Sequence, residues 1–128
     1  MQIKMQDILG YTAFYDAVKD QKMPTKTAYK LAKIAKEVEG EISFYQEKLR
    51  KIVLEHGLLD EQGNPVPTED GMGIKLREGH EQACNDAMEE LQNVEVIIGN
   101  YALTLEELDS LEISLTEMGY IMPFIEEN

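Results

Sequence analysis

Residues 25–56 read TKTAYKLAKIAKEVEGEISFYQEKLRKIVLEH, and this stretch decides the fold because it forms one continuous helical pattern. It contains no proline, and its apolar side chains recur every three or four residues, which places them on one face of an α-helix. The stripe consists of Leu31, Ile34, Val38, Ile42, Tyr45, Leu49 and Ile52. At 1.5 Å per residue the helix would be about 48 Å long. The rest of so short a chain can hardly cover that length, so we expect part of the stripe to face a second copy.

Gly40 lies inside this predicted helix, where glycine costs about 1 kcal/mol relative to alanine. It marks either a close approach by another element or a local weakness. The helix should end at His56-Gly57, because glycine is common just after a helix C-terminus.

Apolar periodicity predicts two further helices. The first precedes the long helix and should end near Gln21, because Pro24 then interrupts the pattern. The second runs from His80 to Gln92 and is amphipathic, with acidic and amide side chains opposite an apolar stripe. The second helix should therefore lie on the surface.

The segment between the long helix and the His80–Gln92 helix is rich in turn residues. We read residues 66–77 as a β-ribbon, because residues 73–77 alternate like a strand with Ile74 and Leu76 on the buried face. Asp70-Gly71 suits a tight turn within this ribbon.

A short strand is predicted at residues 94–98, which are mostly β-branched. Gly99-Asn100 suits a two-residue hairpin turn, so we expect this strand to pair with residues 101–103. The result would be a small antiparallel sheet.

Two capping boxes predict helix starts in the C-terminal part of the chain. They pair Thr104 with Glu107 and Ser114 with Glu117, so that each hydroxyl accepts an early backbone N–H and each glutamate reaches back. Pro123 cannot sit deep inside a helix, so the last helix should kink or restart there.

Length and composition agree with one compact domain. A chain of 128 residues with 43% apolar residues can bury a core without a metal or disulfide. We therefore predict an α+β, helix-dominated single domain over residues 1–128, with one long helix at about 25–56 and a small antiparallel sheet.

Acidic side chains are concentrated after the long helix. Residues 57–128 contain seventeen carboxylates against only Lys75 and Arg77, and the whole chain has a net charge of −13. A strongly negative surface repels nucleic-acid backbones and attracts basic protein surfaces. We therefore predict a host or phage protein partner with a basic surface, and no direct binding of nucleic acid. The predicted acidic face consists of Glu81, Asp86, Glu89, Glu90, Glu106, Glu107, Asp109 and Glu112.

Residues that carry catalysis or bind metals are scarce. Cys84 is the only cysteine, and it falls on the apolar stripe of its predicted helix, so we expect a buried thiol rather than a nucleophile. The histidines are His56 and His80, and His80 with Cys84 supplies only part of a zinc ligand set. We expect no enzymatic activity, no cofactor and no metal.

The sequence also favours a cytoplasmic protein that does not enter a membrane. A single cysteine excludes an internal disulfide. No apolar run approaches the roughly 18 residues of a membrane span, and residues 1–7 lack the plan of a signal peptide.

A basic strip begins the long helix and offers an alternative site. Lysines recur there every three or four residues and have two interpretations, a solvated flank or an anion site. Together with a tyrosine that stacks on a base, such a site could bind a small nucleotide. Its candidates are Lys26, Lys30, Lys33, Lys75, Arg77, Tyr29 and Tyr101.

Five stretches of the chain carry a resemblance to a known family. They are residues 23–33 (MPTKTAYKLAK), 41–45 (EISFY), 60–65 (DEQGNP), 91–96 (LQNVEV) and 123–125 (PFI). In this order they resemble a family of small proteins of unknown function encoded by tailed phages and prophages of Gram-positive bacteria. The resemblance implies a viral gene product in a bacterial cytoplasm, and it carries over no catalytic or binding residue.

Three binding functions follow from these features. The first is inhibition of a host protein, such as an immune nuclease, whose basic groove meets the acidic face; complementary charge would speed encounter and set orientation. Reversal to lysine of Glu89, Glu90, Glu106 and Glu107 should then abolish binding. The alternatives are a sponge that sequesters a small nucleotide signal between subunits, and a virion-assembly factor that pairs helices with a phage structural protein.

Overall fold

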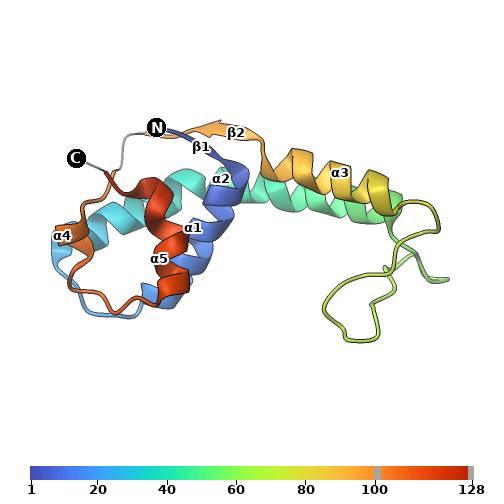
Figure 1. Cartoon of the computed structure of the whole chain (residues 1–128), viewed down its shortest axis with the longest axis horizontal. Helices are drawn as coiled ribbons and strands as arrows, with labels where there is room; N and C mark the ends of the chain where they lie inside the picture. Colours follow the sequence, from blue (N-terminus) through green and yellow to red (C-terminus); the bar gives the residue numbers. More distant parts are fainter. Residues whose placement is uncertain (100–101, 127–128) are drawn as a thin grey trace. The chain divides into compact units, whose positions relative to one another are not determined.

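Helices dominate the computed structural model, which describes residues 1–99 and 102–126 (Figure 1). The fold is α+β, as predicted, and the long helix has the predicted bounds. In chain order the elements are β1 (Gln2–Lys4), α1 (Met5–Val18), α2 (Thr25–His56), α3 (Glu81–Gln92), β2 (Glu95–Ile97), α4 (Leu105–Leu108), α5 (Leu115–Ile121) and the 3-10 turn η1 (Met122–Phe124).

Contacts divide the chain into two compact units, and α2 runs through both of them. Unit 1 consists of residues 1–42 and the C-terminal segment from Glu95, whereas unit 2 consists of residues 43–94. Each unit is described separately below.

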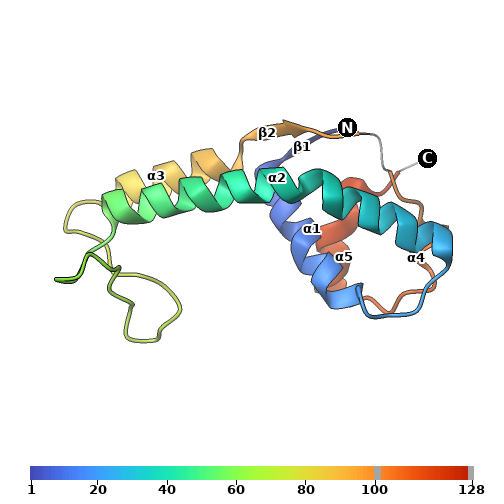
Figure 2. The same cartoon turned by 180° about the vertical axis from the view of Figure 1, so that it is seen from behind.

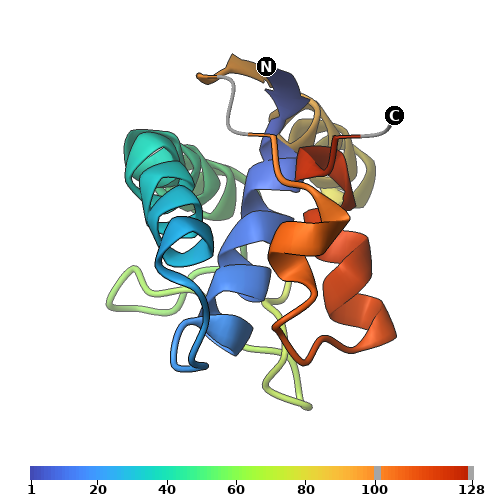
Figure 3. The same ribbon diagram turned by 90° about the vertical axis from the view of Figure 1, so that its left-hand side faces the viewer.

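The core of unit 1 forms where α1 meets α5 and the first half of α2. Figure 3 shows α1 between these two helices. The Tyr11 hydroxyl donates a hydrogen bond to the Leu31 carbonyl and joins α1 to α2. On the other side, Gly10 faces Tyr120 of α5, and a Cβ built at Gly10 would be in ordinary van der Waals contact with it, at 3.5 Å from its backbone oxygen. The fully buried side chains are Tyr11, Phe14, Phe124, Met5, Ile8, Leu31, Ile34, Leu103, Ile121, Val18 and Val38.

The sheet is two-stranded and antiparallel, but its pairing differs from the prediction. β2 pairs with β1, with Val96 opposite Ile3, and not with residues 102–103, which are the described part of the predicted partner strand. Both central side chains are buried, and backbone hydrogen bonds between Met1 and Ile98 extend the pairing. The predicted turn residue Asn100 lies outside the described residues, as does Tyr101. The turn residues after β2 suggested a partner nearby in the sequence, whereas the strand that pairs with β2 lies at the N-terminal end of the chain.

The first helix ends at Val18, earlier than the predicted end near Gln21. The Gln21 side chain instead joins the segment between α4 and α5. Its Nε2 donates to the Glu112 carbonyl at 3.0 Å, and the Glu112 N–H donates to its Oε1 at 2.9 Å. This two-point contact connects the loop between α1 and α2 to the segment between α4 and α5.

Both predicted capping boxes are present and define the starts of α4 and α5. Thr104 Oγ1 accepts the Glu107 N–H at 3.2 Å, and Ser114 Oγ accepts the Glu117 N–H at 3.1 Å. The predicted interruption at Pro123 is η1, which follows α5 directly. Local sequence therefore determines the helix boundaries of this segment.

In unit 2, α3 runs beside the second half of α2 (Figure 2). In the segment that joins them, the predicted ribbon over residues 66–77 is present as an isolated antiparallel bridge, and two further bridges lie outside that range or at its end. Leu59 pairs with Pro65, and Pro67 pairs with Ile74. Since proline has no N–H to donate, two prolines in this short segment interrupt the ladder.

Gly40 has no neighbour that requires its small size. A Cβ built there would meet no described atom within 4 Å, outside the helix's own backbone. Of the two interpretations of Gly40, the structure supports local weakness of α2 rather than close approach.

Candidate functional site

The predicted acidic face divides between the two units. Glu81, Asp86, Glu89 and Glu90 are exposed on α3, in unit 2. The members of the second group belong to α4 and the segment that follows it in unit 1, and they are Glu106, Glu107, Asp109 and Glu112. The eight carboxylates thus form two groups, one on each unit.

The α3 group faces solvent because the opposite side of the helix packs inward. Leu91 is buried and Ala87 is half-buried, and these apolar positions turn the glutamates outward. Asp86 accepts a hydrogen bond from Gln82 at 2.8 Å. Among the described residues, no ion pair neutralises the α3 group.

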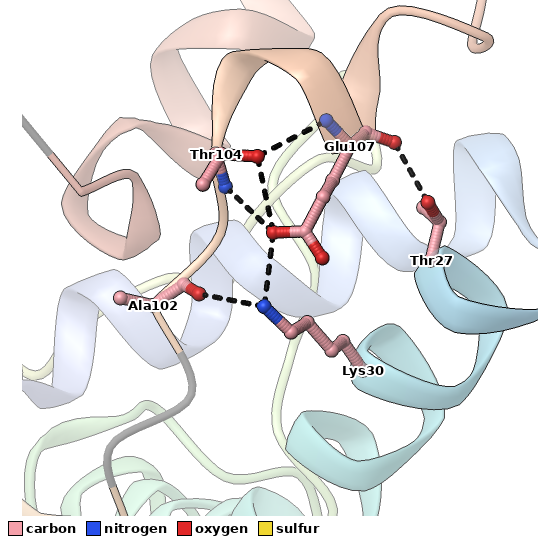
Figure 4. A network of polar contacts seen from close by, with 5 residues as sticks. All are labelled: Thr27, Lys30, Ala102, Thr104 and Glu107. Carbon is pink, nitrogen blue, oxygen red and sulfur yellow. Dashed lines mark hydrogen bonds and ion pairs between the residues drawn. The ribbon is translucent and has the colours of Figure 1, made fainter.

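The second group contains one carboxylate with a structural role, Glu107. Its side chain is only 12% exposed, and Oε1 lies 2.9 Å from Nζ of Lys30 on α2 (Figure 4). Oε1 also accepts hydrogen bonds from the backbone and hydroxyl of Thr104, at 3.0 and 3.1 Å. The Glu107 carbonyl accepts the Thr27 hydroxyl at 2.9 Å. Glu107 therefore connects α4 to α2, and its carboxylate is not available to bind a partner.

Two opposing effects set the pKa of Glu107. Burial raises the pKa, but hydrogen bonds from Lys30 and Thr104, together with the Lys30 charge, outweigh it and hold the pKa below its ordinary value. Oε2 is also buried, and no described group donates a hydrogen bond to it. The ionised form of this carboxylate is thus the one that the folded protein stabilises.

The exposed members of the second group, Glu106, Asp109 and Glu112, are different from Glu107. None of them forms an ion pair within the described residues. With the α3 group they make up what we call the free carboxylates, namely Glu81, Asp86, Glu89, Glu90, Glu106, Asp109 and Glu112.

The alternative anion site is divided in the same way. Lys26, Tyr29 and Lys33 share one face of α2 in unit 1, with Lys33 Nζ 5.8 Å from the centre of the Tyr29 ring. Tyr29 is 62% exposed, so its ring is accessible for stacking. Lys30 turns away from this face, and its Nζ contacts Glu107 and the Ala102 carbonyl. Tyr101 lies outside the described residues.

The two basic residues of unit 2 lie in the segment between α2 and α3. Lys75 is exposed. The Arg77 guanidinium donates to the carbonyls of Gly57 and Leu54, at 3.0 and 3.3 Å. A positive group at this position satisfies carbonyls at the C-terminal end of α2 and opposes the negative end of its dipole. Arg77 therefore has a structural role in the fold.

The sequence analysis did not predict that the two histidines contact each other. His56 and His80 bring their Nδ1 atoms to 3.1 Å, so one ring donates a hydrogen bond to the other. Their positions could have indicated this contact, since the two histidines lie at opposite ends of the segment that joins α2 to α3. Cys84 is half-buried rather than buried, because α3 exposes most of its first two turns. Within residues 1–99 and 102–126, no three His, Cys, Asp or Glu side chains are grouped to hold a metal ion.

None of the helices in the described part of the chain is long and apolar enough to cross a membrane. No protein-family model, curated protein or solved structure matches the chain. The fold and the surface therefore define a class only: a helix-dominated α+β protein with two groups of exposed carboxylates.

Proposed function

We propose that this chain is a non-enzymatic, phage-encoded binding protein that inhibits a basic protein of the host, in the host cytoplasm. The observation that supports this proposal is the state of the free carboxylates: they are exposed, and no lysine or arginine of the described residues pairs with them. A partner that binds nucleic acid has the complementary surface, because its basic groove is built to meet phosphates.

Electrostatics then gives the mechanism of inhibition. Charges of opposite sign on the two proteins accelerate encounter and orient the complex. The carboxylates would occupy the positions that phosphates take in the partner's groove, so the inhibitor and the nucleic acid compete. Both the rate of association and the affinity should fall as salt screens these charges.

The first test is retention of host proteins on the tagged chain at low and high salt. The matched variant carries E81Q, D86N, E89Q and E90Q on α3, which removes charge but keeps side-chain shape. We expect a nucleic-acid-binding host protein to be retained by the wild type, lost at high salt, and released by added DNA. Retention of the same proteins by the variant, unchanged by salt, would contradict the proposal.

The same experiment distinguishes the other functions. A phage structural protein retained at high salt would indicate virion assembly. A nucleotide released from the purified chain by heat, and identified by mass spectrometry, would indicate sequestration. Two candidate residues of the nucleotide site, Lys30 and Arg77, are engaged within the fold, which leaves fewer cations for sequestration.

We also propose that the second half of α2 mediates self-association. Tyr45, Leu49 and Ile52 are half-buried, whereas the first half of the same stripe is buried. Beside it, Phe44 is 41% exposed and borders a groove of about 400 Å³ that Ala87 and Leu91 also line. Light scattering over a range of micromolar concentrations tests this, and a constant monomeric mass would contradict it.

A further inference from the structure

We infer that α4, α5 and η1 form a docking groove for a positively charged segment of the partner that carries apolar side chains. This inference rests on the proposed function, because it names the place on unit 1 where a basic partner is held. The groove has a volume of about 760 Å³. It is lined by Thr104, Leu105, Glu106, Met118, Met122, Ile125 and Glu126.

The floor of the groove is apolar and open to solvent. Leu105 is 63% exposed and Met122 is 56% exposed, while Met118 and Ile125 are half-buried. Single exposed apolar side chains are common on protein surfaces, but several that converge on one hollow mark an interaction site. Methionine is flexible and polarisable, so two methionines let the groove adapt to different apolar side chains.

The fold holds these side chains outward. Ile121 and Phe124 are fully buried, so Met122, which lies between them, projects to the surface. The backbone of Leu103 donates a hydrogen bond to the Phe124 carbonyl and accepts one from the Glu126 N–H, both of 2.7 Å, so the lining residues Ile125 and Glu126 are held beside the residue that precedes Thr104. The groove is therefore formed before a partner binds, which lowers the entropic cost of binding.

Charge determines what the groove accepts. Glu106 and Glu126 contribute carboxylates to its lining, and no basic residue is among the lining residues. The sequence after Arg77 contains no lysine or arginine at all. Lysine or arginine side chains of a bound segment would meet these carboxylates while its apolar side chains fill the floor. An anionic membrane surface would be repelled by the same carboxylates.

The test uses a fluorescent amphipathic peptide of leucine and lysine, with binding followed by anisotropy. The variants are L105Q and M122Q in the groove, and the matched control is L115Q, because Leu115 is 92% exposed but does not line the groove. We expect each groove variant to weaken binding by about tenfold, as loss of a central contact does, and L115Q to bind like the wild type. Equal affinities for all three variants would overturn the inference.

Charge variants separate this inference from the proposed function. E106Q and E126Q in the groove are compared with D109N and E112Q, which remove the same charge from exposed positions that do not line it. If the two groove variants and the two control variants weaken peptide binding equally, the inference about the groove is wrong, but the proposal that exposed carboxylates bind a basic partner stands. If a control peptide with glutamate in place of lysine binds the wild type equally well, the proposed function itself is wrong.

A second copy of the chain is the remaining occupant to exclude, since its α2 carries lysines. We expect L105Q and M122Q to leave the mass in solution unchanged. A dimer that dissociates in both variants but not in L115Q would overturn the inference, because the groove would then be a self-association surface.

Discussion

Lys30 Nζ lies 2.9 Å from Glu107 Oε1, and the two residues are 77 positions apart in the chain. Both side chains are mostly buried, at 30% and 12% exposure. The pair joins α2 to α4 at the point where Thr27 also donates to the Glu107 carbonyl (Figure 4). It therefore positions the helix from which Leu105 and Glu106 project into the groove.

A double-mutant cycle measures how strongly this pair stabilises unit 1. K30M leaves a buried carboxylate without its cation, and E107Q places an amide where Oε2 has no described hydrogen-bonding partner. We expect each single change to lower the free energy of unfolding by about 1–3 kcal/mol. The double variant should cost clearly less than the sum, with a coupling of about 1 kcal/mol or more in urea denaturation.

The pair Lys51 and Glu47 provides the control for this cycle. It is also an ion pair, but its atoms are 3.9 Å apart and its side chains are 60% and 67% exposed. Exposed pairs of this kind contribute roughly 0–1 kcal/mol, so its coupling should be the smaller of the two. Equal couplings would show that burial does not strengthen the Lys30–Glu107 contact.

Acid should weaken the contribution of Glu107. Its pKa in the folded state lies below the ordinary value of 4.5, so the unfolded chain takes up the proton first as pH falls. The stabilisation is therefore complete above about pH 4.5 and is lost as pH falls through the lower, folded-state pKa. The difference in unfolding free energy between wild type and E107Q should shrink between pH 7 and pH 3. A constant difference would contradict this assignment.

Two glycines should respond to alanine in opposite directions. At Gly40 the added Cβ meets open space, so G40A should stabilise the protein by about 1 kcal/mol through helix propensity. At Gly57 the Cβ would lie 2.5 Å from the Val53 carbonyl oxygen, so G57A should destabilise it by about 1–3 kcal/mol. Thermal unfolding of both variants checks the prediction, and a shift of the same sign in both would contradict it.

Removal of the Arg77 guanidinium should loosen the end of α2. In R77M the carbonyls of Leu54 and Gly57 lose their donors, and hydrogen bonds to charged groups contribute about 1.5–3 kcal/mol. Amide exchange around Gly57 should then accelerate by about tenfold or more. K75M removes an exposed positive charge from the same segment and should leave exchange unchanged. Equal acceleration in both variants would point to net charge as the cause.

The sequence predicts those features of the fold that depend on near neighbours. The bounds of α2 follow from the spacing of its apolar stripe, and the starts of α4 and α5 follow from residues three apart. Pairing of β1 with β2 could not be read in this way, because Ile3 and Val96 come from distant parts of the chain. The predicted hairpin at Gly99 relied on turn residues alone and therefore chose the wrong partner.

Only part of the candidate surface could be predicted from the sequence. Exposure of the α3 glutamates follows from helical periodicity. The structural role of Glu107 could not be predicted from periodicity, because its partner Lys30 is remote in sequence. A charge reversal that includes Glu107 would disturb the capping box and the ion pair together, so it cannot report on partner binding alone. Removal of charge only at exposed positions avoids this.

The most direct measurement is the affinity of the retained host partner for the wild type and for a variant with E89Q, E90Q, E106Q and D109N. Isothermal titration at several salt concentrations would give both dissociation constants. We expect the wild-type affinity to fall steeply with salt, and the variant to bind at least about tenfold more weakly at low salt. Equal affinities for the two proteins, independent of salt, would contradict the account.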